Sequence, residues 1–406
     1  MSPRAFAVFV ALTIASVLFS DTDASTFNPV IIVPGTGGSR IEAKLDKPST
    51  KHFYCSKKSD WYTLWLSVTQ LLPPAINCWV DNIKLLWDST TGLYRNNDGV
   101  TTRVPGWGST DGFEYLDPSL KVGQSDYFHT LVEALVSAGG VRNVSIRGSP
   151  YDFRHAPSSF VFGNATWLEH MTELVETTFQ ANGNKQVTIL SHSMGCLYSL
   201  WFLNQKDAAW KAKYIKRWIP TAGVFGGAGS GIKQLLSGSN EGIPGVKGIT
   251  VRDEQRSYES SMLLAPTPQA FEDFTLVQVE GKNYTASDYA ELFDMSSFQN
   301  GFTRYSRVAN LTANLVHPGV DVTHFYGTDV DTPTSFSYPS ADFTKEPVTT
   351  TGDGDGTVPI ASLRSVERWT ENKGFTFDFK TFPKETHTSV LKSKAYLGAL
   401  KALLLN

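Results

Sequence analysis

A serine in the stretch QVTILSHSMGCLY (186–198) has the setting of a catalytic nucleophile. Ser193 follows a β-branched, apolar run and precedes the helical pattern of CLYSLWFLNQ. A nucleophile exposed by so sharp a strand-to-helix turn needs small residues two positions away on either side, and these are Ser191 and Gly195. The pentapeptide alone also fits a serine that only caps a helix. The prediction therefore depends on partners elsewhere in the chain.

A base and an acid are expected from loops after late strands, because a nucleophilic serine needs a histidine to take its proton and a carboxylate to orient that histidine. One large class of hydrolases has these residues in the order Ser, Asp, His. We predict that His387 is the base, since it alone of the eight histidines falls between the last expected strand and the last expected helix. Asp355, in TTTGDGDGTVP (349–359), is the predicted acid, with Asp353 as its alternative.

Three other histidines and one cysteine are poor candidates for chemistry. His192 adjoins the nucleophile, but successive side chains diverge on such a turn, so it is not expected to be the base. His129 and His170 fall within helical patterns, where surface or packing roles are expected. Cys196 lies in an apolar helix start and is expected to pack rather than react.

Two backbone N–H groups are candidates for stabilising an oxyanion. Helix atoms begin directly after Ser193, so the N–H of Met194 would face the reacting carbonyl oxygen. The second donor is expected in VPGTGGSR (33–40), after the first strand, with Thr36 as the candidate. This loop matches neither G-x-G-x-x-G nor G-x-x-x-x-G-K-[ST], so nucleotide binding is not expected.

The acidic GDGDG stretch could also suggest a calcium loop. A twelve-residue loop that starts at Asp353 would need a glutamate at position 364, which is Arg364. The other acids and histidines lack the spacing of metal ligands, and an acyl-serine mechanism needs none. The sequence therefore implies no metal and no cofactor.

The elements that must carry these residues alternate between short β-rich runs and helical patterns. Strands are expected at 29–35, 143–148, 186–190, 215–223, 320–327 and 374–382, and helices at 127–140, 165–180 and 388–405. Such alternation favours a mostly parallel central sheet. Together with the Ser-Asp-His order, it predicts an α/β protein with the α/β-hydrolase fold.

Two regions interrupt this alternation. The first, 61–79, is strongly apolar and aromatic, and the second, 223–248, is glycine-rich and expected to be mobile. We interpret them as cap and lid insertions rather than layers of the hydrolase core. The predicted organisation is one α/β-hydrolase domain over 25–406, with a cap insertion at about 50–90 and a lid region at about 223–265.

The N-terminus has the pattern of a secretory signal peptide. Arg4 precedes the apolar stretch Ala5 to Phe19, and small residues follow at Ser20 and Ala24. The stretch is too short for a membrane span, although a buried core helix is an alternative. A signal peptide over 1–24 is therefore expected, with a destination in the secretory pathway.

Secretion permits disulfides and N-linked glycans. The chain has three cysteines, and a bridge between Cys55 and Cys78 would bracket one Trp- and Leu-rich segment and leave Cys196 free. Sequons of the form N-x-[ST] are expected to carry glycans, and they occur at Asn143, Asn164, Asn283 and Asn310.

The charge of the chain is nearly balanced. Its 36 Lys and Arg residues and 39 Asp and Glu residues leave a formal net charge of −3. Nucleic-acid binding would leave a basic footprint, so it is not expected. No long run of like charge occurs, which argues against a polybasic membrane anchor.

Longer blocks of the chain resemble the lecithin:cholesterol acyltransferase family and, within it, the lysosomal phospholipase A2 branch. The resemblance covers nearly the whole mature chain. The blocks are PVIIVPG (29–35), IEAKLDKP (41–48), FYCSKKSDWYTLWL (53–66), CWVDNIKLLWD (78–88), VPGWG (104–108), LDPS (116–119), PYDFRHAP (150–157), SHSMG (191–195) and GDGDGTV (352–358).

This resemblance implies an activity and a set of partners. An acyl-serine would form at Ser193, with Asp355 and His387 completing the triad. An acyl chain would pass from a glycerophospholipid to water or to a lipid alcohol such as ceramide, at a membrane surface. The implied location is the lysosome or the outside of the cell.

The resemblance also assigns roles in the cap. It implies the Cys55–Cys78 disulfide. It also implies an exposed interfacial anchor, although these residues could instead pack as core. The residues of the implied anchor are Trp61, Trp65, Leu66, Leu71 and Leu72.

Some positions depart from the family. Thr36 stands where the lysosomal branch has an aspartate, and a carboxyl there would have to be protonated to help an oxyanion. We therefore expect activity that is less confined to acid pH. The family's second disulfide has no cysteines here, and TAGVFGG (221–227) lacks the family's usual proline.

Two alternative functions remain open. The acceptor could be a sterol, because the shape of the acceptor pocket is not readable from sequence. The chain could also be an inactive lipid-binding protein, although the intact Ser-Asp-His order argues against a decayed site.

Overall fold

The computed structural model describes residues 27–405, apart from 122, 241–244, 312–313 and 373. The expected signal peptide over 1–24 lies outside the described residues. Within the described part of the chain, no helix is both long and apolar enough to cross a membrane.

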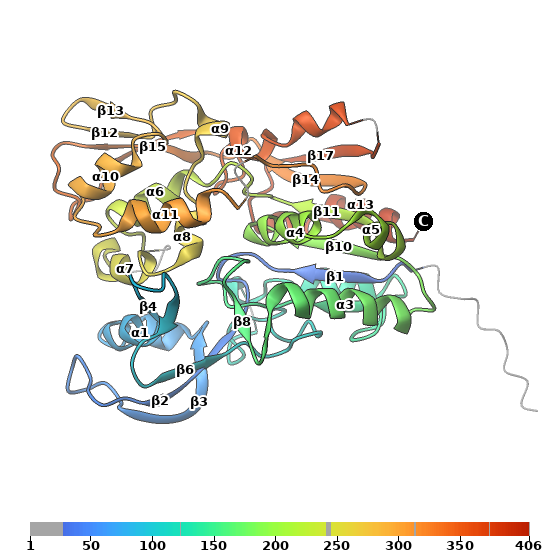
Figure 1. Ribbon diagram of the computed structural model, residues 1–406, viewed down its shortest axis with the longest axis horizontal. Helices are drawn as coiled ribbons and strands as arrows, with labels where there is room; N and C mark the ends of the chain where they lie inside the picture. Colours follow the sequence, from blue (N-terminus) through green and yellow to red (C-terminus); the bar gives the residue numbers. More distant parts are fainter. Residues whose placement is uncertain (1–26, 122, 241–244, 312–313, 373, 406) are drawn as a thin grey trace, which may run out of the picture.

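A six-stranded sheet forms the centre of the molecule (Figure 1). Every pairing within it is parallel. All six expected strands are present in it, with shifted ends. In spatial order the strands are β17 (Phe377–Pro383), β14 (Val322–Thr328), β11 (Ile215–Thr221), β10 (Val187–His192), β1 (Val30–Val33) and β7 (Ile146–Gly148).

Helices cover both faces of this sheet because its apolar residues alternate between the faces. Val30 and Ile32 of β1 pack in one buried cluster, and Ile31 and Val33 pack in the other. The first cluster includes residues of α2 (His129–Val136) and α13 (Lys394–Leu404). The second includes residues of α3 (Trp167–Ala181) and α4 (Met194–Asn204), and α5 (Ala208–Tyr214) lies against α3. This arrangement confirms the predicted α/β-hydrolase fold.

The closing helix is shorter than expected. The segment predicted as one helix over 388–405 is divided into the 3-10 turn η4 (Ser389–Lys392) and α13. Ser393 has an extended backbone, with φ −65° and ψ 131°, and separates the two. The chain after β17 can therefore turn at η4 before it packs along the sheet.

The strand order reverses between β1 and β10. The chain continues from β1 to β7 on one side, and later places β10, β11, β14 and β17 on the other side. In open α/β sheets, ligands bind outside the carboxyl ends of the strands at such a reversal. The loops after β1 and β10 are therefore the expected place for a site.

The segment between β1 and β7 forms a separate lobe, at the lower left of Figure 1, which we call the cap lobe (41–103). It is wider than the predicted cap at about 50–90. The Cys55–Cys78 disulfide joins the loop before β3 to α1, and Cys196 is free and buried. The elements of the cap lobe are β2 (Ile41–Asp46), β3 (Lys58–Trp65), η1 (Val68–Leu71), α1 (Ile76–Ile83), β4 (Leu85–Trp87), β5 (Tyr94–Asn96) and β6 (Val100–Arg103).

A further lobe, which the sequence did not predict as a unit, contains a four-stranded mixed sheet and most of the short helices. We call it the upper lobe after its place in Figure 1. Its strands are β13 (Lys282–Tyr284), β12 (Val277–Val279), β15 (Thr332–Tyr338) and β16 (Val348–Gly352). Its helices are α6 (Gly229–Leu236), α7 (Gly248–Gln255), α8 (Glu259–Leu263), α9 (Pro268–Phe271), α10 (Tyr289–Met295) and α11 (Gly301–Ala309).

Short elements complete the chain. They are η2 (Gly123–Ser125), β8 (Val161–Phe162), β9 (Ala165–Thr166), α12 (Ile360–Arg364) and η3 (Glu367–Glu371).

The first part of the predicted lid does not support the expectation of mobility. Residues 223–229 are buried. A Cβ added to Gly226 would lie 2.3 Å from the Cβ of Ala270, and one added to Gly229 would lie 2.1 Å from the carbonyl oxygen of Pro333. These glycines therefore serve close packing of the backbone in the interior.

Candidate active site

Ser193 lies at the tip of the turn between β10 and α4. Its backbone has φ 57° and ψ −127°, a conformation that costs roughly 1–3 kcal/mol for a residue with a side chain. The two flanking small positions are tightly packed. A Cβ on Gly195 would lie 2.3 Å from the carbonyl oxygen of Pro34, and the Ser191 hydroxyl accepts a hydrogen bond from the Trp218 indole at 2.5 Å. This packing holds the strained turn that presents Ser193.

The structure brings the three predicted catalytic side chains together. The Nε2 atom of His387 lies 2.8 Å from the Ser193 Oγ, and its Nδ1 atom lies 2.7 Å from the Asp355 Oδ2. His387 follows β17, and Ser193 follows β10, so both lie at the carboxyl ends of parallel strands. This linear hydrogen-bonded chain is the geometry that general-base activation of a serine requires.

Asp355 is fully buried and held by its own backbone surroundings. Its Oδ1 accepts hydrogen bonds from the N–H groups of Thr357 at 3.0 Å and Val358 at 2.7 Å. Burial alone would raise the pKa of Asp355, but the His387 imidazole and the two backbone amides hold it below its usual range. The carboxyl is therefore an anion that can orient the imidazole.

The alternative acid lies outside this chain of hydrogen bonds. Asp353 is exposed, and its carboxylate accepts a hydrogen bond from the backbone N–H of Asp329 at 2.8 Å. Asp355 instead forms a parallel bridge with Val330, directly after β14. The β15–β16 excursion thus returns the chain to the end of β14, where the acid is needed.

The loop after β1 lies directly against the nucleophile. A Cβ added to Gly35 would come 2.6 Å from the Ser193 Cβ, so only a glycine fits there. Thr36 follows this glycine and is exposed. Met194 is the first residue of α4, and the first N–H groups of a helix have no acceptor within it. Met194 follows Ser193 in the chain, and Thr36 belongs to the loop that packs against Ser193. The role of their backbone N–H groups as oxyanion donors remains a prediction.

A second histidine supports the site without joining the triad. Both ring nitrogens of His192 form hydrogen bonds. Nδ1 lies 2.5 Å from the Tyr127 hydroxyl, and Nε2 lies 2.8 Å from the carbonyl oxygen of His387. A carbonyl can only accept, so Nε2 carries the proton and Nδ1 accepts from Tyr127. The Tyr127 oxygen also accepts from the N–H of Gly35 at 3.0 Å. One chain of hydrogen bonds therefore connects the loop after β1 to the backbone of the base.

The protonation of His192 suits this supporting role. Burial, together with the nearby His387, lowers its pKa to about 3. The ring is therefore neutral at neutral and mildly acid pH, and its tautomer is set by the two partners. His192 forms no hydrogen bond to Ser193 in the structure, and no signal in the sequence indicated its partnership with Tyr127.

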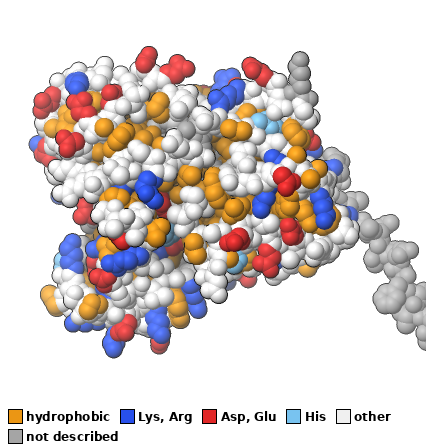
Figure 2. Space-filling model, in the orientation of Figure 1, with side chains coloured by type: hydrophobic (Ala, Val, Ile, Leu, Met, Phe, Trp, Pro, Cys, Tyr) orange, Lys and Arg blue, Asp and Glu red, His pale blue; other side chains and the backbone are white. Residues whose placement is uncertain are grey.

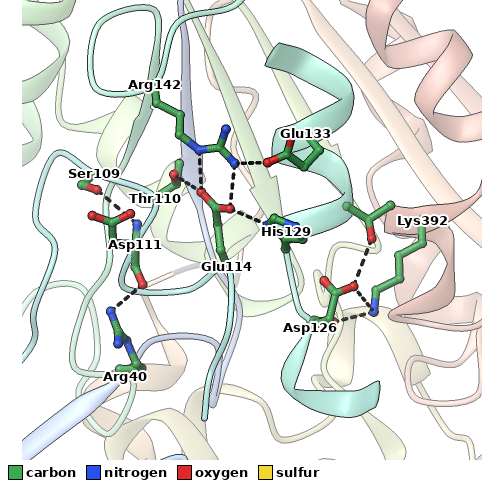
Figure 3. Close-up of polar contacts among 11 residues, drawn as sticks. Arg40, Ser109, Thr110, Asp111, Glu114, Asp126, His129, Glu133, Arg142 and Lys392 are labelled. Atoms are coloured by element: carbon green, nitrogen blue, oxygen red, sulfur yellow. Dashed lines mark hydrogen bonds and ion pairs between the residues drawn. The ribbon is translucent and has the colours of Figure 1, made fainter. Parts of the chain in front are cut away.

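Charged groups fasten the segment that carries Tyr127 (Figure 3). The Lys392 ammonium donates to the carbonyl oxygen of Asp126 at 2.5 Å and lies 3.5 Å from its carboxylate. Lys392 ends η4, the turn that follows His387. This contact ties the loop of the base to the residue before Tyr127.

A neighbouring cluster in Figure 3 has the residue types of a metal site but forms an ion-pair network. Ligand atoms of Glu114, His129 and Glu133 lie within 4.8 Å of one another. Arg142, however, donates to both Glu114 oxygens, at 3.1 and 2.9 Å, and to Glu133 at 2.7 Å. Burial would raise the pKa of Glu114, but Arg142 leads the hydrogen bonds that lower it. The guanidinium already supplies the positive charge here, so the cluster is an ion-pair network that anchors α2.

Trp65 connects the cap lobe to the site. Its indole N–H donates to the carbonyl oxygen of Gly37 at 2.6 Å, and its ring packs against Trp79 and Phe153. The side chain is half-buried. Trp65 therefore supports the loop after β1, a position different from that of a free membrane anchor.

The other implied anchor residues divide by exposure. Trp61 and Leu72 are 38% and 47% exposed, Leu66 is half-buried, and Leu71 is buried in the core. Leu71, the last residue of η1, therefore does not fit the anchor role, because its side chain packs in the larger apolar cluster. Phe53, which the resemblance did not single out, is 97% exposed on the same lobe.

A buried ion pair in the block PYDFRHAP joins the cap lobe to the core. Arg154 is fully buried and donates to both oxygens of Asp152, at 2.8 and 2.5 Å. It also donates to the Ile83 carbonyl at 2.8 Å and to Asn96 and Thr102 at 3.0 Å each. Sequence reasoning recorded this block only as part of the resemblance, and missed this role.

Other predicted positions lie as expected for their roles. Cys196 is buried, and burial raises the pKa of its thiol to about 12, which favours packing over reactivity. His170 stacks on Phe162 in a surface hairpin. The four sequon asparagines, Asn143, Asn164, Asn283 and Asn310, are all exposed, and their glycosylation remains a prediction.

Comparisons with known proteins match most of the chain. The family model for lecithin:cholesterol acyltransferase matches residues 61–394. The lysosomal phospholipase A and acyltransferase of Canis lupus familiaris is 38% identical over 93% of this chain and 91% of its own length. The phosphatidylcholine-sterol acyltransferase of Mus musculus is 34% identical over 93% of this chain and 85% of its own.

One solved structure shares the overall fold. A chain in the crystal structure of the Tle4-Tli4 complex aligns with a TM-score of 0.54 at 13% identity, covering 93% of this chain and 98% of that one. The fold and the length of the family match lead to one conclusion: the chain belongs to the lecithin:cholesterol acyltransferase family.

Proposed function

We propose that this chain is a serine acyl hydrolase and transacylase of the phospholipase A type. It removes an acyl chain from a glycerophospholipid and passes it to water or to a lipid alcohol such as ceramide. The hydrogen-bonded chain from Ser193 through His387 to Asp355 is the observation that carries this proposal. Membership of a family of phospholipases and acyltransferases supports the substrate class.

The first half of the reaction forms an acyl-enzyme. The Ser193 oxygen attacks the ester carbonyl carbon while His387 Nε2 takes the hydroxyl proton. The N–H groups of Thr36 and Met194 are proposed to stabilise the oxyanion. The ester C–O bond then breaks, and the lysophospholipid leaves as an alcohol with the proton from His387. Asp355 stabilises the imidazolium and keeps its orientation.

The second half repeats these steps with a new nucleophile. Water or a lipid alcohol gives its proton to His387 and attacks the acyl-serine carbonyl. Breakage of the bond to the Ser193 oxygen restores the serine, which regains the proton from His387. Water gives a free fatty acid, and ceramide gives an acylceramide.

The substrate is reached at a membrane surface through the cap lobe. Its exposed apolar side chains include Phe53, Trp61 and Leu72. Figure 2 shows orange apolar side chains beside blue Lys and Arg side chains on this lower-left lobe. Aromatic and aliphatic side chains of this kind enter the interface, and nearby cations favour anionic headgroups. Leu71 is assigned to the apolar core instead, and the half-buried Trp65 and Leu66 to packing against it.

The proposed destination is the secretory pathway, ending in the lysosome or outside the cell. The Cys55–Cys78 disulfide and the four exposed sequons support an oxidising, glycosylating compartment. The lysosomal relative supports the lysosome in particular.

The test follows the acyl chains of mixed liposomes of phosphatidylcholine, ceramide and cholesterol, at about pH 4.5 and about pH 7.4. Ser193→Ala is the control, because it removes only the nucleophilic oxygen. Free fatty acid and acylceramide, both absent with the variant, are the expected products.

Two other outcomes would change the assignment. Cholesteryl ester as the main product would transfer the chain to the sterol branch of the family. Equal blanks from the wild type and the variant would leave a lipid-binding protein as the better account.

A further inference from the structure

A pocket between the cap lobe and the upper lobe contains two arginines that form no ion pair within the described residues. It has a volume of about 300 Å³ and lies outside the proposed catalytic residues. Leu85 and Trp87 of β4 line it on one side, and Phe298, Gln299 and Arg304 line it on the other, together with Arg256 after α7. Asp253, an exposed residue of α7, also lines the pocket. In Figure 1, α7 lies directly above β4, and a hydrogen bond of 2.9 Å from the Leu85 N–H to the Ser257 hydroxyl joins the two segments.

Arg256 is nearly buried, and its hydrogen bonds go to uncharged oxygens. Nε donates to the Leu235 carbonyl at 2.7 Å, and Nη2 donates to the Leu236 and Ser296 carbonyls at 3.2 and 3.1 Å and to the Ser296 hydroxyl at 3.1 Å. Burial, with the nearby Arg252, lowers its pKa to about 10, although the charge of Asp253 acts in the opposite direction, so the group still carries a full charge at neutral pH. The hydrogen bonds leave Nη1 without an assigned acceptor in the described part of the chain.

Arg304, on α11, has the same character. Nε donates to the Tyr94 hydroxyl at 2.9 Å, and Nη2 donates to the carbonyl oxygen of Arg256 at 2.5 Å. Its guanidinium carbon lies 5.2 Å from the centre of the Phe298 ring, and that of Arg256 lies 4.8 Å from the same centre. Two cations therefore share one aromatic ring at the wall of the pocket.

Such a pair is costly without an anion. Buried charges in proteins are normally paired, and two like charges in a medium of low dielectric repel each other. Carbonyl, hydroxyl and ring contacts offset part of this cost, and so does the nearby charge of Asp253. Asp253 is exposed, however, and forms no ion pair with either arginine in the described part of the chain. Guanidinium groups match the geometry of phosphate and carboxylate oxygens.

We propose that this pocket is an anion-binding site that takes a phosphate group through Arg256 and Arg304. The bound anion lies between β4 of the cap lobe and the α7–α11 side of the upper lobe, and links them. A free phosphate and a phospholipid headgroup present the same chemistry. The site is independent of acyl transfer at Ser193.

The first test measures the melting temperature of the full mature chain in inorganic phosphate and in chloride at equal ionic strength. Phosphate stabilises many proteins because it is excluded from their surfaces. The informative quantity is therefore the part of the increase in melting temperature that is lost when the pocket is changed. We expect an increase of roughly 2–5 °C beyond chloride for the wild type, and its loss in Arg304→Gln. Arg364→Gln, at an exposed arginine on α12, should keep the full increase.

Gln299→Glu tests the site by a second route, in case Arg304→Gln fails to fold. Gln299 is exposed at the pocket wall, so the new carboxylate can supply the missing charge. This variant should melt at a higher temperature in chloride and respond less to phosphate than the wild type. Equal phosphate increments in the wild type and Arg304→Gln, or no stabilisation by Gln299→Glu, would overturn the proposal.

Vesicles separate the two sources of phosphate. Flotation with phosphatidylcholine vesicles, with and without phosphatidic acid, is compared for the wild type and Gln299→Glu. Extra binding to phosphatidic acid that Gln299→Glu loses would assign the site to a lipid headgroup. Equal vesicle binding by both proteins, together with the expected rise in the wild-type melting temperature in phosphate, would assign the site to a soluble anion.

Discussion

The central sheet and the cap lobe are stabilised in different ways. All six residues of β10 are buried, and the strand packs on both faces. In β3 of the cap lobe, only Leu64 is buried. A strand enclosed on both faces is held by a large apolar area, whereas a strand with one solvent face depends more on individual contacts.

The cap lobe shares one apolar cluster with one face of the central sheet, and specific hydrogen bonds add to this packing. They include the bonds from Arg154 to Ile83, Asn96 and Thr102, and the bond from Trp65 to Gly37. The Cys55–Cys78 disulfide stabilises the lobe internally. Ser193 and His387, the proposed nucleophile and base, lie on the sheet side, while Trp65 reaches the loop after β1 from the cap side. We therefore expect substitutions at the contacts of the cap lobe to change the free energy of unfolding and membrane binding most. Substitutions on the sheet side should change the catalytic rate most.

The largest effect on stability is expected from Arg154→Ala. The substitution would leave Asp152 as a buried, unpaired carboxylate and remove three bonds to the cap lobe. The free energy of unfolding should fall by about 3–5 kcal/mol in denaturant titrations. An exposed control, Arg95→Ala, should change it by less than about 1 kcal/mol. Equal effects of the two substitutions would contradict the role of Arg154.

The pH dependence sharpens this prediction. Burial would raise the pKa of Asp152, but Arg154 holds it below its ordinary value. A carboxyl with a lowered pKa in the folded state contributes stability above its unfolded pKa of about 3.9, and this contribution is lost as pH falls through the folded pKa. The stability difference between the wild type and Arg154→Ala should therefore be full near neutral pH and shrink below about pH 4. A difference that stays constant down to strongly acid pH would argue against the ion pair.

Removal of the disulfide should have the next largest effect on the free energy of unfolding. Replacing Cys55 and Cys78 together by serine frees a loop with a sequence separation of 23 residues. Chain entropy gives a loss of about 3 kcal/mol in the free energy of unfolding, measured against the unreduced wild type. Cys196→Ser, inside the core, is the comparison that changes a thiol without opening a loop. Membrane binding should weaken only in the double variant, because Trp61 lies within the segment that the bridge closes and Phe53 lies two residues before it.

Tyr127→Phe should affect the chemistry more than the fold. It removes the hydroxyl that joins Gly35 to His192, and through His192 the backbone of His387. We expect kcat to fall about tenfold with little change in KM, which corresponds to roughly 1.4 kcal/mol of transition-state stabilisation. Tyr198→Phe is a matched control, because this buried hydroxyl donates to the His155 carbonyl outside the chain. A similar fall in kcat for both variants would assign the Tyr127 hydroxyl to general packing.

Thr36→Asp should change the shape of the pH–rate profile. Position 36 lies in the loop that packs against Ser193. An ionised carboxyl there would repel the developing oxyanion, so the ratio of activity at about pH 7.4 to that at about pH 4.5 should fall, by roughly tenfold. Thr36→Asn, of similar size and without charge, should keep the ratio of the wild type. A wild-type profile that itself collapses above about pH 6 would contradict this expectation.

The sheet and the three residues of the proposed triad could be predicted from signals that one sequence contains. Buried parallel strands are continuous apolar runs, and the turn at Ser193 requires small neighbours at fixed offsets. Asp355 and His387 follow from chain order on such a fold. Runs, offsets and chain order can all be read without knowing which distant side chains meet.

The supporting contacts could not be predicted, because they join residues that are distant in sequence. Tyr127 meets His192, and Arg154 meets Ile83, only after the chain has folded. The upper lobe was missed for a related reason. Its strands are short, and β12 pairs with β15 across a long separation in sequence. Burial of Leu71 beside exposed Leu72 likewise depends on how η1 packs, which apolar composition alone does not specify.

The most direct test of the central claim is labelling by a serine-directed fluorophosphonate, with the modified peptide identified by mass spectrometry. The account predicts one adduct, on Ser193, and a labelling rate in His387→Ala that falls by about 10³-fold or more, since the base is lost. Unchanged melting temperatures of the variant would show that the fold is retained. An adduct on another serine, or equal labelling of wild type and His387→Ala, would contradict Ser193 as the activated nucleophile.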